Sequence, residues 1–263
     1  MAPPAPPASP ITPNGRVALV TGANSGIGRV TAVELALRGF HVFVACRSAD
    51  KAGEVLREIS LRSAGTAKAE FIALDLGDLD SVRQCAQAFN ARELPLNLLI
   101  NNAGLAGQKG FTKSGFELAF GVCHVGHFLL TRLLLDRLKE AAPSRVVVVA
   151  SRAHRHAKGI DFSAVRQPSR SRGGLMDYSV AKLANILFSA ELARRMAGTG
   201  VTTYSLHPGV VATGIWRVLP WPLDRLVKPF MISSEEGAKT TLYCATSDAV
   251  AHQSGLYYVS STV

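Results

Sequence analysis

A tyrosine and a lysine stand four residues apart in the segment Tyr178-Ser179-Val180-Ala181-Lys182. On a helix, residues at this spacing share one face, so the two side chains would be neighbours. A phenol with an ordinary pKa of about 10 accepts protons poorly at neutral pH, and a nearby ammonium favours the phenolate and lowers that pKa. The pair therefore predicts an acid–base group that exchanges a proton with a substrate oxygen.

Ser151 directly follows the apolar run at residues 145–150, which contains four consecutive valines. This run is predicted to be a buried strand. In a parallel sheet the carboxyl ends of strands border the ligand crevice, so the Ser151 hydroxyl is expected to hold a carbonyl or alcohol oxygen beside Tyr178. A serine after a strand is common by itself. A glycine turn followed by such a serine and then by a YxxxK pattern is much less common by chance.

A glycine-rich segment at residues 21–28 joins the first predicted strand to the first predicted helix. Its glycines, Gly22, Gly26 and Gly28, allow the backbone to turn tightly and to approach a pyrophosphate, which the N–H groups of the helix N-terminus would bind. The spacing differs from the usual GxGxxG pattern. A tight turn without a ligand is the alternative interpretation.

The end of the second predicted strand bears on the choice of dinucleotide. An acidic residue there would bind the ribose hydroxyls of NAD, but the sequence reads Cys46-Arg47. A guanidinium can hold a 2′-phosphate through two parallel hydrogen bonds, so Arg47 favours NADP, with NAD as the alternative. The other interpretation is an ordinary solvated arginine.

Short apolar runs alternate with helical patterns along the chain, as is typical of parallel strands buried on both faces. We predict a single doubly wound Rossmann-type α/β domain, with a central parallel sheet and helices on both faces. Strands are expected at 17–20, 41–45, 71–74, 96–100, 145–150 and 201–206, and helices at 27–38, 49–61, 81–89, 116–139 and 178–196.

The composition is that of a globular protein, with 48% hydrophobic and 18% charged residues among 263. This excludes a disordered chain. The four cysteines are far apart, so neither a disulfide framework nor a metal site is predicted. The net charge of +10 favours anionic partners in general, but no nucleic-acid-binding motif accompanies it.

The N-terminal residues form a distinct region because six prolines fall within residues 1–13. We expect a disordered proline-rich tail over residues 1–15, followed by one catalytic domain over residues 16–263. No apolar run is long enough for a membrane span, and the N-terminal residues lack the basic-then-apolar pattern of a signal peptide. Reduced cysteines then favour a cytoplasmic location.

Six motifs occur in order along the chain: TGANSGIG at 21–28, ALDL at 73–76, NNAG at 101–104, VVVVAS ending at 151, YSVAK at 178–182 and HPGVVAT at 207–213. With this set the chain resembles the short-chain dehydrogenase/reductase family from Arg16 to Tyr258. GHFLLT at 126–131, KLANILF at 182–188 and the HPGVV run at 207–211 are most similar to the retinol-dehydrogenase-like branch. That branch oxidises or reduces retinoids, other lipid aldehydes or steroids with NADP(H).

The resemblance implies a role for each matching residue. Tyr178 would exchange the proton, Lys182 would lower the pKa of Tyr178 and hold the nicotinamide ribose, and Ser151 would orient the substrate oxygen. Hydride would pass between the nicotinamide and the carbon that bears that oxygen. The residues implied to bind the cofactor are Gly22, Asn24, Ser25, Gly26, Ile27, Gly28, Arg47, Asp75, Leu76, Asn102, Ala103, Gly104, Tyr178, Lys182, Pro208, Gly209 and Thr213.

The chain departs from the family at Cys123, where relatives carry an asparagine that helps to hold a water in the proton relay. A thiol is a weaker hydrogen-bonding partner, so impaired but not abolished catalysis is expected. The branch also usually begins with a membrane-anchoring helix and continues further at its C-terminus. A dinucleotide-binding sensor or scaffold with little or no catalysis is therefore the alternative function.

The segment at about residues 210–235 is expected to act as a substrate lid, because the corresponding segment covers the substrate in this family. It contains both tryptophans of the chain, which suit a small hydrophobic alcohol or carbonyl substrate. Interleaved basic residues also allow peripheral contact with a membrane. The apolar stripes of the helices at 116–139 and 178–196 are implied to pair in a homodimer, although packing on the sheet explains many of the same residues.

Overall fold

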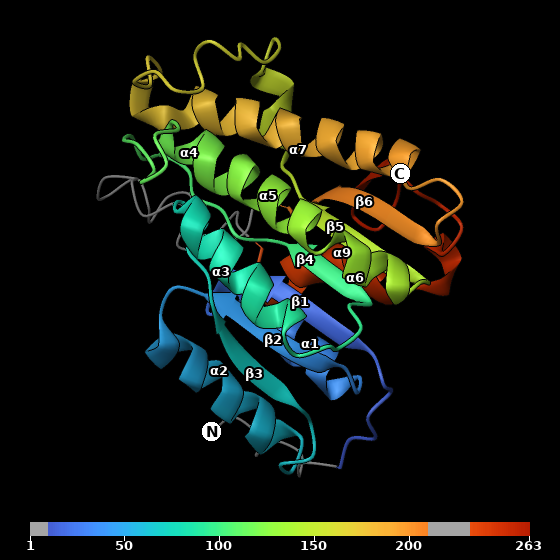
Figure 1. Cartoon of the computed structure of the whole chain (residues 1–263). Coiled ribbons are helices and arrows are strands. Elements are labelled where there is room, and N and C mark those ends of the chain that lie inside the picture. Colours follow the sequence, from blue (N-terminus) through green and yellow to red (C-terminus); the bar gives the residue numbers. More distant parts are fainter. Residues whose placement is uncertain (1–9, 210–231) are drawn as a thin grey trace.

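The computed structural model describes residues 10–209 and 232–263, and among these seven strands form one parallel sheet in the order β3-β2-β1-β4-β5-β6-β7 (Figure 1). The order reverses between β1 and β4, which is where an open α/β sheet binds its ligand. The strands are β1 (Val17–Thr21), β2 (His41–Cys46), β3 (Ala69–Ala73), β4 (Leu98–Asn101), β5 (Ser144–Val149), β6 (Val201–His207) and β7 (Leu256–Val259).

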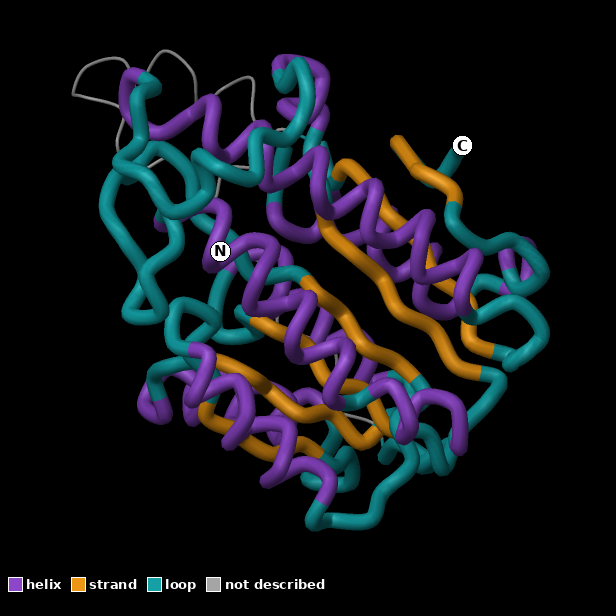
Figure 2. The backbone as a smooth tube through the Cα atoms, turned by 45° about the horizontal axis from the view of Figure 1, so that its top comes forward, coloured by secondary structure: helices purple, strands orange, loops and turns teal. Residues whose placement is uncertain are grey.

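Helices cover both faces of this sheet (Figure 2), as predicted for a doubly wound Rossmann-type domain. Successive strand residues point to opposite faces, so Ala18 and Val20 pack under one layer while Val17 and Leu19 pack under the other. The first layer contains α1 (Gly26–Leu37), α2 (Ala49–Arg62) and α9 (Ser234–Thr246). The second contains α3 (Leu79–Asn90), α5 (Gly126–Leu133), α6 (Leu135–Glu140) and α7 (Leu175–Arg195).

The region predicted as one helix at 116–139 is helical but interrupted. It consists of a short α4 (Leu118–Phe120), a π-helical turn η1 (Gly121–Val125), α5 and α6, with Leu134 at φ −102° and ψ 2° between the last two. Within η1 the backbone N–H of Gly126 donates to the carbonyl of Gly121, one residue further back than in an α-helix. The prediction of a continuous helix was therefore wrong, because the periodicity of the apolar residues does not report an inserted residue.

Two elements near the C-terminus were not predicted. The helix α9 begins at the cap residue Ser233, whose hydroxyl accepts the N–H of Glu236, and it buries mostly small residues such as Ala238 and Thr241. The strand β7 adds a parallel edge next to β6. Short 3-10 turns complete the described elements at η2 (Arg152–His156), η3 (Arg172–Gly174) and η6 (Asp248–Val250).

The predicted tail and lid fall largely outside the described residues, so both stay predictions. Of residues 10–15, Ile11 donates its N–H to Thr66 and Asn14 donates its N–H to the carbonyl of Gly39. Of the predicted lid, only residues 232–235 are described.

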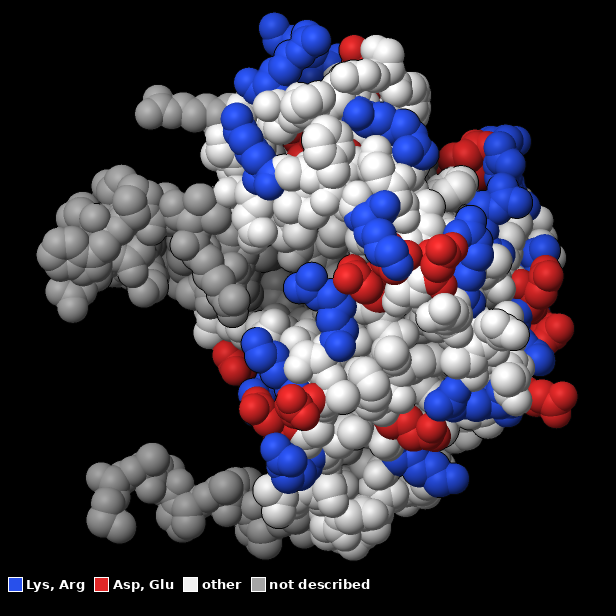
Figure 3. Space-filling model, turned by 60° about the vertical axis from the view of Figure 1, so that its left-hand side comes forward, with Lys and Arg blue, Asp and Glu red and all other residues white. Residues whose placement is uncertain are grey.

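Charged residues of both signs are interspersed over the face drawn in Figure 3. Several of them form ion pairs, for example Arg62 with Glu34 and with Glu58. Within residues 10–209 and 232–263, no helix is long and apolar enough to cross a bilayer. The same residues contain no group of three or more histidine, cysteine or acidic side chains arranged to hold a metal ion.

Candidate active site

The glycine turn connects β1 to α1 at the carboxyl edge of the sheet. Gly22 and Gly26 have φ angles of 65° and 53°, which residues with a Cβ rarely adopt. Gly28 is required for a different reason, because a Cβ there would overlap the carbonyl oxygen of Gly22 and the side-chain amide of Asn102. The turn is thus folded directly onto the end of β4.

The N-terminus of α1 has the features of a phosphate site. Ser25 is the N-cap residue, it is exposed, and its side chain makes no capping hydrogen bond. Unpaired N–H groups and the positive end of the helix dipole favour an anion there, and the missing Cβ atoms allow it to approach. Asn24 is half-buried beside the turn, whereas Ile27 is buried in the core. These residues fit the pyrophosphate of a dinucleotide.

The loop after β4 is held against this turn by hydrogen bonds. The side-chain amide of Asn102 donates to the carbonyl of Thr21 at 2.8 Å, and the backbone N–H groups of Asn102 and Ala103 donate to the Thr21 hydroxyl at 2.9 and 3.0 Å. A Cβ on Gly104 would come to 3.5 Å from both the Lys182 Nζ and the Cys123 Sγ. Asn102 therefore supports the turn with its side chain, and Gly104 leaves the approach to Lys182 open.

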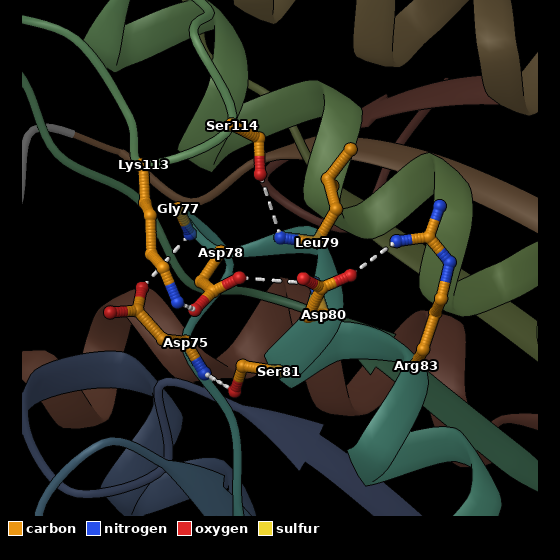
Figure 4. A network of polar contacts seen from close by, with 9 residues as sticks. All are labelled: Asp75, Gly77, Asp78, Leu79, Asp80, Ser81, Arg83, Lys113 and Ser114. Carbon is orange, nitrogen blue, oxygen red and sulfur yellow. Dashed lines mark hydrogen bonds and ion pairs between the residues drawn. The ribbon is translucent and has the colours of Figure 1, made fainter.

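The predicted adenosine side lies at the ends of β2 and β3. Arg47 is exposed immediately after β2, and Leu76 is buried. The Asp75 carboxylate accepts the N–H of Gly77 at 2.9 Å, which fixes its direction (Figure 4). This loop is tied to the segment before α4, because Lys113 pairs with Asp78 at 2.6 Å and the N–H of Leu79 donates to the Ser114 hydroxyl.

Ser151, Tyr178 and Lys182 come together at the end of β5. Ser151 is the N-cap residue of η2, and its hydroxyl lies near the phenol of Tyr178, which is in the first turn of α7. Lys182 lies one turn further along, buried, with its Nζ 5.5 Å from the centre of the Tyr178 ring. That ammonium donates a 2.7 Å hydrogen bond to the carbonyl of Val149. The predicted convergence of the three side chains is thus present.

Burial dominates the electrostatic balance at Tyr178. It raises the pKa of the Tyr178 phenol above its ordinary value, and the nearby Ser151 hydroxyl opposes this only in part. Burial also lowers the pKa of Lys182, since both charged forms lose their hydration. The net shift of the Tyr178 pKa is therefore upward in this arrangement, and the expected lowering of that pKa by the Lys182 ammonium stays a prediction.

Cys123 lies in the π-helical turn and faces the same space. Its Sγ contacts the backbone N–H and carbonyl of Leu105, both at 3.4 Å. Burial raises the pKa of this thiol, which the nearby Lys182 ammonium opposes. The Cys123 carbonyl accepts two side-chain hydrogen bonds, from Asn185 at 3.1 Å and from His127 at 3.0 Å. Cys123 is thus a neutral, weakly polar neighbour of Lys182.

Pro208 and Gly209 follow β6 at the opposite side of the crevice from the glycine turn. Gly209 has a φ of 95°, and a Cβ there would overlap the side chain of Ile232. His207, at the end of β6, accepts the N–H of Arg152 at 3.3 Å, which joins β6 to the segment after Ser151. Thr213, the last predicted cofactor residue, lies outside the described residues.

The profile of the short chain dehydrogenase family matches residues 16–220. The chain belongs to this family. Retinol dehydrogenase 11 from Mus musculus is 46% identical over 93% of this chain and 77% of its own length, and retinol dehydrogenase 12 from Homo sapiens has the same identity and coverage. Dehydrogenase/reductase SDR family member 13 from Bos taurus is 45% identical over 95% of this chain and 67% of its own length.

Solved structures of short-chain dehydrogenases and reductases share the fold. A protein assigned as an NAD(P) dependent gluconate 5-dehydrogenase from Beutenbergia cavernae, with bound NADP, superposes with a TM-score of 0.74 at 26% identity over 96% of this chain and 97% of that one. This short-chain dehydrogenase is thus in the retinol-dehydrogenase-like branch and is an oxidoreductase that acts on CH–OH groups. It takes a nicotinamide dinucleotide and a small alcohol or carbonyl substrate.

The sequence patterns did not single out two buried polar residues of this dehydrogenase, although both lie inside motifs of the retinol-dehydrogenase-like branch. His127 belongs to the GHFLLT run and Asn185 to the KLANILF run. Both are almost fully buried, at 1% exposure each. Because both residues lie within helical patterns, the sequence predicted only that they pack in the helices. A polar residue on an otherwise apolar helix face is the feature that would have identified them.

A cavity of about 570 Å³ lies on the side of α7 that does not carry the reactive pair. Met176 and Val180 line it, and residues two positions apart on a helix, such as Met176 and Tyr178, point in different directions. Its other walls come from residues 156–165 and from Phe120 and Glu117 on the α4 side. Segment 156–165 and the crevice therefore lie against different faces of this short-chain dehydrogenase's α7.

Proposed function

We propose that this chain interconverts a hydrophobic alcohol and its aldehyde or ketone, of retinoid, lipid aldehyde or steroid type, with NADP(H). The observation that carries the proposal is the meeting of Ser151, Tyr178 and Lys182 beside a glycine turn that fits a dinucleotide. The retinol dehydrogenase names of its relatives support the retinoid class. The intact trio supports catalysis over the alternative of a binding-only sensor or scaffold.

Each residue of the trio has a role in the reduction. Ser151 donates a hydrogen bond that orients the substrate oxygen beside the Tyr178 phenol. In the reduction the Tyr178 phenol gives its proton to that oxygen, and in the oxidation the Tyr178 phenolate takes the proton from the alcohol. Lys182 stabilises the negative charge that forms on Tyr178 as the proton leaves. The dinucleotide, when bound, supplies or accepts the hydride.

A substrate screen tests this function. NADPH and NADH are compared side by side with retinal, long-chain aldehydes and steroid ketones, and nicotinamide absorbance reports turnover, with the Tyr178→Phe variant as the blank. We expect turnover of an apolar carbonyl compound that the blank lacks. Dinucleotide binding without turnover of any compound in the panel would instead support the binding-only alternative.

Arg47 is proposed to select NADP by binding its 2′-phosphate. An Arg47→Ala variant is expected to lose about 10- to 100-fold in kcat/KM with NADPH, because a hydrogen-bonded charge pair is removed, and to change little with NADH. The control is Lys51→Ala, which removes an exposed positive charge from the nearby helix α2. An Arg47→Ala enzyme that kept its preference for NADPH would contradict this role.

Cys123 is proposed to weaken the proton relay beside Lys182. A Cys123→Asn variant is expected to raise kcat about fivefold, because an amide forms stronger hydrogen bonds than a thiol. Cys123→Ala, which removes the polar atom, is the matched control and is expected to show no gain. The measurement is kcat at saturating cofactor and substrate, together with the melting temperature, and an unchanged or lower kcat in a folded Asn variant would contradict the idea.

Two surfaces support proposals about partners and location. Phe128, Leu133 and Leu187 are exposed apolar residues on α5 and α7, and they support a homodimer that pairs these helices. Phe162 is 75% exposed within a segment rich in basic residues, which supports peripheral contact with a membrane. The four cysteines are unpaired and buried, which supports a cytoplasmic location.

A further inference from the structure

His127 and Thr21 form a buried polar contact between α5 and the end of β1. The Thr21 side chain is fully buried and His127 is 1% exposed. The Thr21 hydroxyl lies 2.8 Å from the Nε2 of His127, and its oxygen also receives the backbone N–H groups of Asn102 and Ala103. The other acceptor within reach of the Thr21 hydroxyl proton is the carbonyl of Ile100, which is farther away at 3.3 Å.

The partners of His127 determine which of its nitrogens carries the proton. The Nδ1 lies 3.0 Å from the carbonyl of Cys123, and a carbonyl can only accept, so Nδ1 carries the proton and donates it. The Nε2 of the neutral ring is then an acceptor and takes the Thr21 hydroxyl proton. A charged ring would direct a third N–H at a Thr21 oxygen whose two lone pairs already serve Asn102 and Ala103. Only the neutral imidazole with its proton on Nδ1 satisfies every donor and acceptor in this network.

The surroundings of His127 also favour the neutral form. Burial lowers the pKa of His127 to about 3, and the positive charge of Lys182 and the neighbouring His124 act in the same direction. The backbone of His127 is fixed independently, because its carbonyl accepts the Thr131 hydroxyl, which in turn accepts the side-chain amide of Asn101. The ring is therefore held at both nitrogens, by Thr21 at the end of β1 and by the carbonyl of Cys123.

The two ends of the ring touch two different parts of the site. The Nε2 end supports the glycine turn and the loop after β4, where a dinucleotide fits. The Nδ1 end supports the carbonyl of Cys123, whose thiol shares the space next to Gly104 with the Lys182 ammonium. A shift of the ring would therefore move the turn that carries Cys123, beside Lys182, relative to the cofactor turn.

We propose that His127, in its neutral Nδ1–H form, is a positioning residue that keeps the turn carrying Cys123 in register with the glycine turn that receives the cofactor. The proposal rests on the function proposed above. In this proposal the Thr21 contact affects cofactor binding, and the Cys123 contact affects the rate of the chemical step. Substitutions that keep only one contact should therefore change NADPH affinity and kcat by different amounts.

The first test needs no catalysis. In protein labelled with ¹⁵N-histidine, we expect the His127 imidazole to show a protonated Nδ1 and an unprotonated Nε2, without titration between about pH 5 and pH 8. The His127→Gln variant assigns the signal. An imidazole protonated at Nε2, or one that titrates near its ordinary pKa, would overturn the proposal even if no substrate were known.

The second test separates the two contacts. His127→Leu, which removes both, is expected to weaken NADPH binding and to lower kcat, each about tenfold. The amide of His127→Gln reaches toward Thr21, so this variant is expected to restore NADPH affinity more than kcat. The amide of His127→Asn reaches toward the Cys123 carbonyl, so this variant is expected to restore kcat more than NADPH affinity.

The control for general effects of losing a histidine is His41→Gln, at the start of β2, which is expected to change neither value. Unchanged NADPH affinity and kcat in a folded His127→Leu variant would overturn the proposal. Equal losses in the Leu, Gln and Asn variants would do the same, because a purely structural role does not divide between the two measurements. NADPH affinity is measured by direct binding, so it is informative even if the substrate screen fails.

Discussion

Replacing Tyr178 by phenylalanine is expected to lower kcat/KM by at least about a thousandfold, because the reaction then lacks its positioned proton donor. The ring remains, so packing against Lys182 and the helix α7 is kept. NADPH affinity should change far less than kcat/KM, since the loss concerns one hydroxyl among the many groups implied to bind the cofactor. The measurement is kcat/KM for the best substrate of the screen, with NADPH binding determined in parallel.

Ser151→Ala provides the graded comparison for this prediction. It removes the partner of the phenol but leaves the proton donor, so a smaller loss than that of Tyr178→Phe is expected. If Tyr178→Phe retained more than a few per cent of the activity while Ser151→Ala lost nearly all of it, the proton donor would have to be sought elsewhere in the crevice.

Adding a single methyl group at Gly28 is expected to abolish dinucleotide binding. In Gly28→Ala the Cβ would overlap the Gly22 carbonyl and the Asn102 amide, and neither can yield without opening the turn. Overpacking of this kind costs about 1–3 kcal/mol of stability, and the displaced turn would no longer present its N–H groups to a phosphate. Binding of NADPH and the melting temperature are measured on the same preparation.

Gly53→Ala is the matched control for this substitution. Gly53 lies inside α2, and a Cβ there would come no closer than 3.7 Å to the nearest atom, the end of the Arg57 side chain. Alanine favours the helix by up to about 1 kcal/mol over glycine, so this variant should melt slightly higher and bind NADPH normally. Normal NADPH affinity in a folded Gly28→Ala protein would show that the glycine turn does not bind the dinucleotide.

The parallel sheet and the reactive trio could be predicted from the sequence, because local patterns encode them. Buried parallel strands are continuous apolar runs, and Tyr178 and Lys182 share a helix face through their spacing alone. The π-helical turn around Cys123 could not be predicted, because no residue pattern marks an inserted residue within a helix. The contact of the Asn185 side chain with the Cys123 carbonyl could not be predicted either, because it joins residues far apart in the chain.

The direction of the net pKa shift at Tyr178 could not be predicted from the sequence for a similar reason. The spacing of Tyr178 and Lys182 predicts that they are neighbours. Whether the ammonium lowers the pKa of the phenol by more than burial raises it depends on the residues that surround both side chains. Here α7 and the end of β5 enclose them, and the Lys182 ammonium is engaged by the Val149 carbonyl. Such a balance follows from packing in three dimensions and not from any run of residues.

The two sides of α7 have different freedom to change during evolution. The side with Tyr178 and Lys182 is bound to the sheet, so substitutions there disturb the chemistry. The other side meets residues 156–165 across a cavity. We therefore expect that replacements in segment 156–165 leave the proton donor in place, whereas replacements on the Tyr178 and Lys182 side of α7 disturb it.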